Sequence, residues 1–213
     1  MFLRGLLVCL LFSSTASAHV VMEALKATDQ SQVSAWHYRV TSFENAKLKS
    51  VGVFDPAKEK KQQWLLESFE GRVPTEKETR KFLDKMESAD QEKLSEQVDE
   101  KSLQAIDAGN NPRRWRFHMR KDADLRGVPP EKIAGIITLS EKGDLQRVEY
   151  SNIEAFRVKL ILKMNHIVAV TEYEKQANGD NLVKSEAVET DVSVMGKDIS
   201  LKLRTDYQML RHQ

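Results

Sequence analysis

Cysteine is almost absent from the sequence. Cys9 is the only one among the 213 residues, and it lies in an apolar segment close to the N-terminus. Val8 precedes it, where a lipoprotein signal carries Gly, Ala or Ser, so we expect no lipid anchor at Cys9. Without this segment the chain can form no disulfide, and its fold must depend on its hydrophobic core.

The chain also lacks a charge of one sign. It has 33 Lys and Arg against 32 Asp and Glu, and the first eighteen residues hold one Arg and no acid, so residues 19–213 carry 32 of each. A neutral molecule as a whole attracts neither DNA nor an anionic membrane. We therefore predict no nucleic-acid partner.

Long apolar runs are missing as well. The run from Leu6 to Phe12 is much shorter than the about 20 residues of a membrane-spanning helix, and no later segment approaches that length. Arg4 precedes this run, and Ala16 and Ala18 frame an A-x-A site, which is typical of a secretory signal peptide. We predict cleavage after Ala18 and a soluble periplasmic protein of residues 19–213.

Recognisable catalytic and metal-binding motifs are missing too. The sequence contains no G-x-S-x-G, no HExxH, no phosphate-binding glycine loop and no acidic calcium loop. Its histidines show no metal-ligand spacing. We predict no catalytic residue, no metal and no cofactor. The five histidines are His19, His37, His118, His166 and His212.

The sequence does contain segments in which apolar and polar residues alternate. In WHYRVTSF the residues Trp36, Tyr38 and Val40 fall on one face, which is the period of a half-buried strand. KLKSVGVF and QQWLLESFEG, separated by the turn at Asp55-Pro56, extend this strand to a three-strand antiparallel meander.

Helical signals lie on both sides of this meander. A short amphipathic helix is expected over 20–27, and a helical insertion over about 75–108. Gly71 and Pro74 end the third strand, and Thr75 with Glu78 has the spacing of a capping box. A second helix is expected at Leu94, in a charged segment with few apolar residues.

After Asn110-Asn111-Pro112 the chain reads as sheet, which gives about ten strands in a single domain. One of them, AFRVKLIL, alternates apolar and basic residues, and the last, ISLKLRTDY, alternates likewise, so one face of the sheet is expected to be wet. The segment RRWRFHMRK mixes cations and aromatics. A phosphate-binding patch is possible there, but a solvated strand with Trp115 and Phe117 buried is the simpler interpretation.

The order of elements resembles the periplasmic lipoprotein-carrier superfamily, the LolA/LolB-like proteins: a signal peptide, a short helix, a meander with a Trp-x-Tyr strand, an Asp-Pro turn and a Trp strand, a helical insertion and a long C-terminal meander. The resemblance implies an α+β fold, a curved antiparallel sheet forming an incomplete β-barrel covered by helices. It also implies an apolar concavity that accepts acyl chains. For the family's gating arginine, Arg39 in the first strand is the candidate.

From this resemblance we expect a non-catalytic carrier or binding protein for acyl chains, lipoprotein or another elongated apolar ligand. An envelope-stress or lipoprotein sensor that binds a membrane protein partner is one alternative, and a periplasmic hydrolase with a site assembled from distant residues is another. We expect a monomer. The predicted ligand-binding residues are Trp36, Tyr38, Val40, Trp64, Leu66, Phe156, Val158, Leu160 and Leu162.

Overall fold

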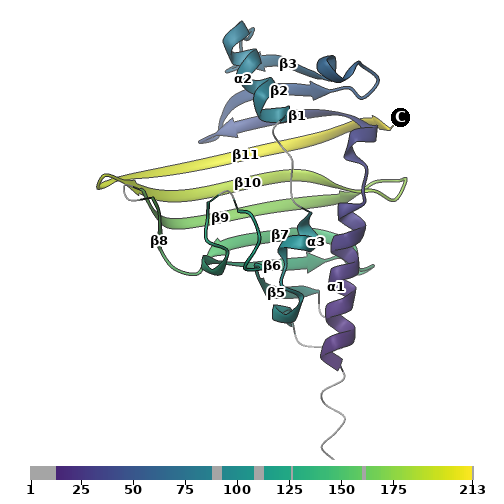
Figure 1. Cartoon of the computed structure of the whole chain (residues 1–213). Helices are drawn as coiled ribbons and strands as arrows, with labels where there is room; N and C mark the ends of the chain where they lie inside the picture. Colours follow the sequence, from purple (N-terminus) through teal and green to yellow (C-terminus); the bar gives the residue numbers. More distant parts are fainter. Residues whose placement is uncertain (1–12, 88–92, 108–112, 126, 160–161, 213) are drawn as a thin grey trace, which may run out of the picture.

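A single curved antiparallel sheet dominates the computed structural model, which describes residues 13–87, 93–107, 113–125, 127–159 and 162–212 (Figure 1). Its strand order is β3-β2-β1-β11-β10-β9-β7-β6-β5-β4, with β8 paired to β9. The sheet is not closed into a barrel, because β3 and β4 form its two edges. The expected fold class, an α+β protein with an incomplete barrel and helices on one face, is confirmed.

Eleven strands and three α-helices make up the described part of the chain, with four single-turn 3-10 helices between them. The strands are β1 Trp36–Glu44, β2 Lys47–Phe54, β3 Trp64–Phe69, β4 Gln104–Ala105, β5 Arg114–His118, β6 Ile133–Leu139, β7 Leu145–Asn152, β8 Phe156–Lys159, β9 Leu162–Lys175, β10 Asn181–Val194 and β11 Lys197–His212. The α-helices are α1 Ser13–Asp29, α2 Glu76–Glu87 and α3 Leu94–Gln97.

The last strand joins the two meanders that the sequence predicts. β11 pairs with β10 on one side and with β1 on the other, so the C-terminal strands continue directly into the N-terminal three. The β9–β10 turn contains Asn178-Gly179, a pair typical of tight hairpins, and Gly179 adopts a φ of +99°. Positive φ is costly for other residues, which explains a glycine at this position.

The two faces of the sheet differ sharply. We call the face covered by α1 and α2 the inner face. On the outer face, cross-strand ion pairs join Arg39 to Glu67 at 3.1 Å and Lys202 to Glu189 at 3.0 Å. The outer face is therefore wet, as the alternation predicts. Because Arg39 lies on this outer face, it does not line the inner face as a gating arginine would.

The main core lies where α1 packs on the inner face of β5, β6 and β7. In β5 the burial alternates as expected for a solvated strand, with Trp115 and Phe117 buried and the intervening side chains exposed. Gly135 lets the Phe117 ring approach β6, since a Cβ there would lie 2.2 Å from Phe117 Cζ. The core residues are Val21, Met22, Ala24, Leu25, Val98, Trp115, Phe117, Met119, Ala123, Ile133, Ile137, Leu139, Leu145, Val148 and Phe156.

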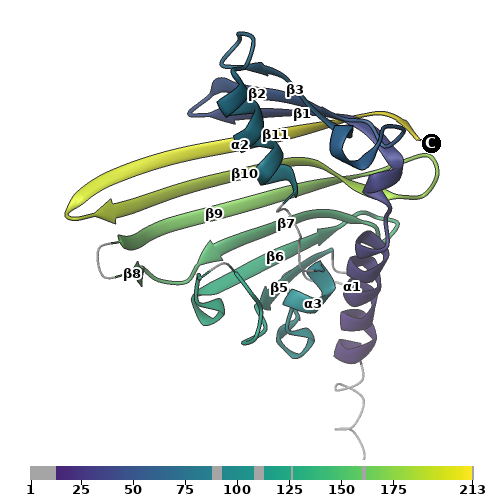
Figure 2. The same cartoon turned by 45° about the horizontal axis from the view of Figure 1, so that its top comes forward.

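A second, smaller core, the aromatic core, lies at the other end of the inner face, where α2 covers β1, β2 and β3 (Figure 2). Phe82 of α2 packs edge-on against Trp64, with ring centroids 5.8 Å apart. Gly52 makes this approach possible, because a Cβ there would lie 2.4 Å from Phe82 Cζ. The buried residues of the aromatic core are Trp36, Tyr38, Val40, Phe54 and Leu182.

Helix α1 is longer than expected and extends across the predicted cleavage site. The side chains by which it enters the main core, Val21, Met22, Ala24 and Leu25, all follow Ala18. Cleavage after Ala18, which stays a prediction, would therefore keep these core contacts. No helix in the described ranges has the length and apolar character needed to cross a bilayer.

The expectation of one continuous strand over 155–162 is wrong. β8 ends at Lys159 and β9 begins at Leu162, and the two pair antiparallel with Phe156 opposite Met164. Leu160 lies outside the described residues. Both arms of a hairpin keep the same alternation, and no Gly, Asn or Pro marks this reversal, so the pattern could not reveal it.

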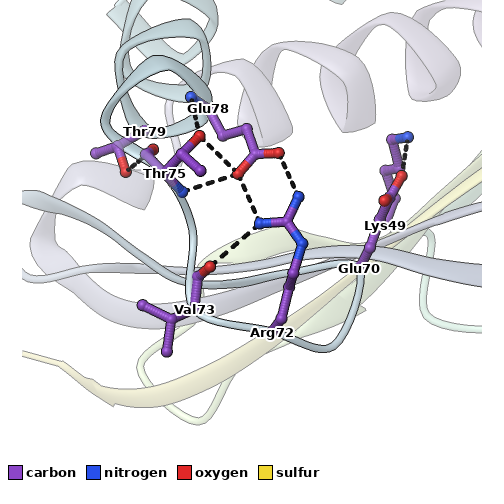
Figure 3. A network of polar contacts seen from close by, with 7 residues as sticks. All are labelled: Lys49, Glu70, Arg72, Val73, Thr75, Glu78 and Thr79. Carbon is purple, nitrogen blue, oxygen red and sulfur yellow. Dashed lines mark hydrogen bonds and ion pairs between the residues drawn. The ribbon is translucent and has the colours of Figure 1, made fainter.

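The capping box at the start of α2 is confirmed and forms part of a polar network (Figure 3). The Glu78 carboxylate accepts a hydrogen bond from Thr75 N at 2.8 Å, and Glu78 N donates to Thr75 Oγ1 at 3.4 Å. Arg72 donates to both carboxylate oxygens of Glu78, at 3.0 and 2.6 Å. This guanidinium, followed by the Thr75 amide, lowers the pKa of Glu78 from 4.5 to about 2.

We expect Glu78→Gln to lower the stability of the protein in a pH-dependent way. A carboxyl whose pKa falls on folding stabilises the folded state above its unfolded pKa and loses this effect as pH falls through the folded value. The difference in unfolding free energy between wild type and Glu78→Gln should therefore be full above about pH 4.5 and shrink towards pH 2. Urea denaturation across this range measures it, and a difference independent of pH would contradict the network.

Candidate functional site

Five of the nine predicted ligand-binding residues lie at the α2 end of the inner face. Trp36, Tyr38 and Val40 are buried members of the aromatic core, Leu66 is buried in the neighbouring strand β3, and Trp64 is half-buried. The Trp36 indole donates to Asp180 Oδ2 at 3.0 Å, so its polar atom is also satisfied. These side chains already pack against protein.

The remaining predicted residues lie elsewhere. Phe156 is buried in the main core and Val158 packs against it. Leu162 is half-buried at the start of β9, and Leu160 is outside the described residues. The structure therefore distributes the predicted set over two cores and does not gather it along one surface.

Two hollows are found on the surface near the β6–β7 turn, and both are lined mainly by polar side chains. Their volumes are about 600 Å³ and 270 Å³. Neither is lined by any of the nine predicted residues. The larger one contains the ion pairs Arg113–Glu141 and Lys175–Asp144 and is lined by Arg113, Ser140, Glu141, Lys142, Asp144, Gln146 and Lys175.

Apolar side chains reach solvent on the inner face of β10 and β11. Ile199 is 49% exposed and Leu203 40% exposed, although both lie on the same face of β11 as Tyr207 and Met209, which pack against the aromatic core. Across the strand pair, Val192 lies opposite Ile199 and Val188 opposite Leu203. We call this surface the open strip; it consists of Val188, Val192, Ile199, Leu201 and Leu203.

The strip is open because the helices cover other parts of the inner face. Figures 1 and 2 show α1 across one end of the sheet and α2 over β1–β3, with no described helix in front of the β10–β11 hairpin tip. At this tip Met195 is 80% exposed. Contiguous exposed apolar side chains on a soluble domain typically mark a binding surface.

The end of the open strip that lies next to the aromatic core is polar. Glu186 of β10 lies opposite Thr205 of β11, and its Oε2 accepts a hydrogen bond from the Tyr207 hydroxyl at 2.8 Å. On the next strand, Ser42 Oγ lies 3.4 Å from Thr205 Oγ1. A carboxylate and several hydroxyl groups therefore lie between the open strip and the aromatic core.

The tyrosines near this polar end are held in their neutral form. Burial raises the pKa of Tyr38 to about 12. Burial, followed by the negative charge of Glu186, raises the pKa of Tyr173 and that of Tyr207 still further. The phenols remain hydrogen-bond donors at neutral pH, and Tyr207 uses its proton to hold Glu186.

Sequence reasoning missed Glu186, and only partly recognised the open strip. The alternation of ISLKLRTDY places Ile199, Leu201 and Leu203 on one face, but it does not say whether anything covers them. The signal for Glu186 is its spacing, because it lies two residues before Val188 and so places a charge on the face that also carries Val188 and Val192.

The described ranges contain no group of three or more His, Cys, Asp and Glu side chains that could hold a metal ion. The predicted absence of a metal and of a cofactor stays a prediction. In comparisons with known proteins, no protein-family model, no curated protein and no solved structure matches the chain.

Proposed function

We propose that the protein is a non-catalytic binding protein that holds an elongated apolar ligand, such as an acyl chain, along the open strip. The observation that carries this proposal is the exposure of Ile199 and Leu203, 49% and 40%, on the inner face of an otherwise well-segregated sheet. The predicted signal peptide would place this function in the periplasm, and the resemblance to lipoprotein carriers points to the same ligand class.

The shape of the strip favours a chain-like ligand. It follows two neighbouring strands, and the seven residues of β10 from Glu186 to Val192 span roughly 20 Å. Apolar surface that leaves water contributes about 25 cal/mol per Å² before the costs of ordering. A flexible chain lying along the strip would remove solvent from all five side chains at once.

The open strip is an exposed surface, in place of the apolar concavity that the resemblance implies. The aromatic residues predicted to contact the ligand lie in the aromatic core, beyond the polar end of the strip, and Leu203 and its neighbours would contact the ligand. The sensor alternative uses the same surface for an acylated protein partner. The hydrolase alternative has no particular contact in its favour.

Calorimetric titration with dodecanol at several temperatures tests the proposal. We expect saturable binding with a negative heat-capacity change, because apolar surface is buried. Purified protein that takes up no dodecanol up to its solubility limit would contradict the proposal. So would a stable dimer that buries the strip, because a second copy would then be its occupant.

A further inference from the structure

Glu186 is a carboxylate on the apolar face of the sheet. Its neighbour along the same face of β10 is Val188, and its partners in register are Thr205 on β11 and Thr171 on β9. Among the described residues, Glu186 forms a single hydrogen bond, from Tyr207, and no ion pair. The charge of this half-buried carboxylate is therefore not paired with a cation among the described residues.

The surroundings of Glu186 are suited to a cation. Tyr207 donates its hydrogen bond to Oε2 of Glu186. The other carboxylate oxygen, Oε1, accepts no hydrogen bond from the residues that the structure describes. The negative charge of Glu186 helps to raise the pKa of two buried tyrosines, Tyr173 in β9 and Tyr207 in β11. Aromatic rings and a carboxylate together form the environment that stabilises a desolvated ammonium group.

We propose that the ligand is an amphiphile with a primary ammonium head group, which Glu186 binds while the open strip binds the chain. This inference rests on the proposed function and adds the chemical class of the head group. It depends on local charge, because residues 19–213 carry equal numbers of acidic and basic side chains and so offer no general attraction for cations.

The test compares dodecylamine with dodecanol, two ligands with the same chain. The amine is protonated at neutral pH, as a lysine side chain is. Wild-type protein should bind dodecylamine roughly tenfold or more tightly than dodecanol, because only the ammonium group adds the attraction of opposite charges to its hydrogen bond with the carboxylate. The preference should fall as salt is added.

Glu186→Gln should abolish this preference, because glutamine keeps the shape and can still accept from Tyr207 but carries no charge to attract the ammonium group. Glu189→Gln is the matched control: Glu189 lies on the outer face of the same strand, 3.0 Å from Lys202, and its loss should change neither affinity. Should Glu186→Gln unfold, Glu186→Asp retains the charge and should retain a preference for the amine.

Two results would overturn the inference: equal affinities of the wild type for both ligands, or a Glu186→Gln variant that still prefers the amine. Both leave dodecanol binding intact and so spare the proposed function. If dodecanol fails to bind at all, the proposed function itself fails, and the head-group assignment falls with it.

Discussion

Phe117→Ala should lower the free energy of unfolding by about 3–5 kcal/mol, as truncation of a buried aromatic side chain does. Phe117 is fully buried in the main core and packs edge-on against Tyr150, with ring centroids 5.7 Å apart. Its ring also covers Gly135 so closely that no other side chain fits there. Alanine would leave a cavity in the main core, among residues that are themselves buried.

The control for this prediction is the preceding residue. Arg116 lies on the exposed outer face of the same strand, so Arg116→Ala should change stability by less than about 0.5 kcal/mol. Chemical denaturation of the three proteins measures both effects. A Phe117→Ala variant within about 1 kcal/mol of wild type would show that this part of the main core is not well packed.

Local sequence patterns were sufficient to predict most of the strands and helices. The alternation around Trp36, Tyr38 and Val40 predicts β1 and its buried face, and the Thr75–Glu78 spacing predicts the start of α2. Both signals depend on residues a few positions apart, where backbone geometry leaves little freedom. For the same reason the solvated strand around Trp115 could be predicted.

These local patterns could not predict which distant strands pair with each other. The pairing of β1 with β11 joins residues more than 150 positions apart, such as Val40 and Tyr207, and nothing in either strand specifies it. The split between β8 and β9 was missed because the alternation continues through the turn. The two-residue strand β4 pairs only with β5 and is too short to show a period.

The candidate site was harder to predict than the fold. Aromatic side chains such as Trp36 and Tyr38 were predicted as ligand contacts, but in the structure the neighbouring side chains of the aromatic core bury them. Whether a residue lies in a core or on an open face depends on which part of the sheet each helix reaches. The alternation of residues identifies the apolar face of β11. Leu203 on this face is exposed because α2 covers β1, β2 and β3 instead.

Leu203→Asp should remove binding of an apolar ligand with little effect on stability. The side chain is 40% exposed on the open strip, so its replacement should change the free energy of unfolding by no more than about 1 kcal/mol. A ligand chain lying on the strip would bury the new carboxylate, and an unpaired charge in an apolar contact costs several kcal/mol. We expect dodecanol affinity to fall at least roughly tenfold.

Gln208→Asp provides the matched control. It introduces the same side chain and the same charge into the same strand, but on the outer face, opposite Arg39 of β1. The intrinsic effect of aspartate in a strand should be equal in the two variants. The cross-strand neighbours differ, Glu44 opposite Leu203 and Arg39 opposite Gln208, so the unfolding free energy of each variant is measured beside its affinity. Only a ligand on the inner face distinguishes them.

Calorimetric titration of dodecanol into wild type, Leu203→Asp and Gln208→Asp is therefore the most direct measurement of where the ligand binds. Binding on the open strip predicts equal dodecanol affinities for wild type and Gln208→Asp. Only Leu203→Asp should lose dodecanol affinity, and it should do so while it remains folded. Equal affinities in all three proteins would place the ligand elsewhere and contradict the proposed function of the inner face.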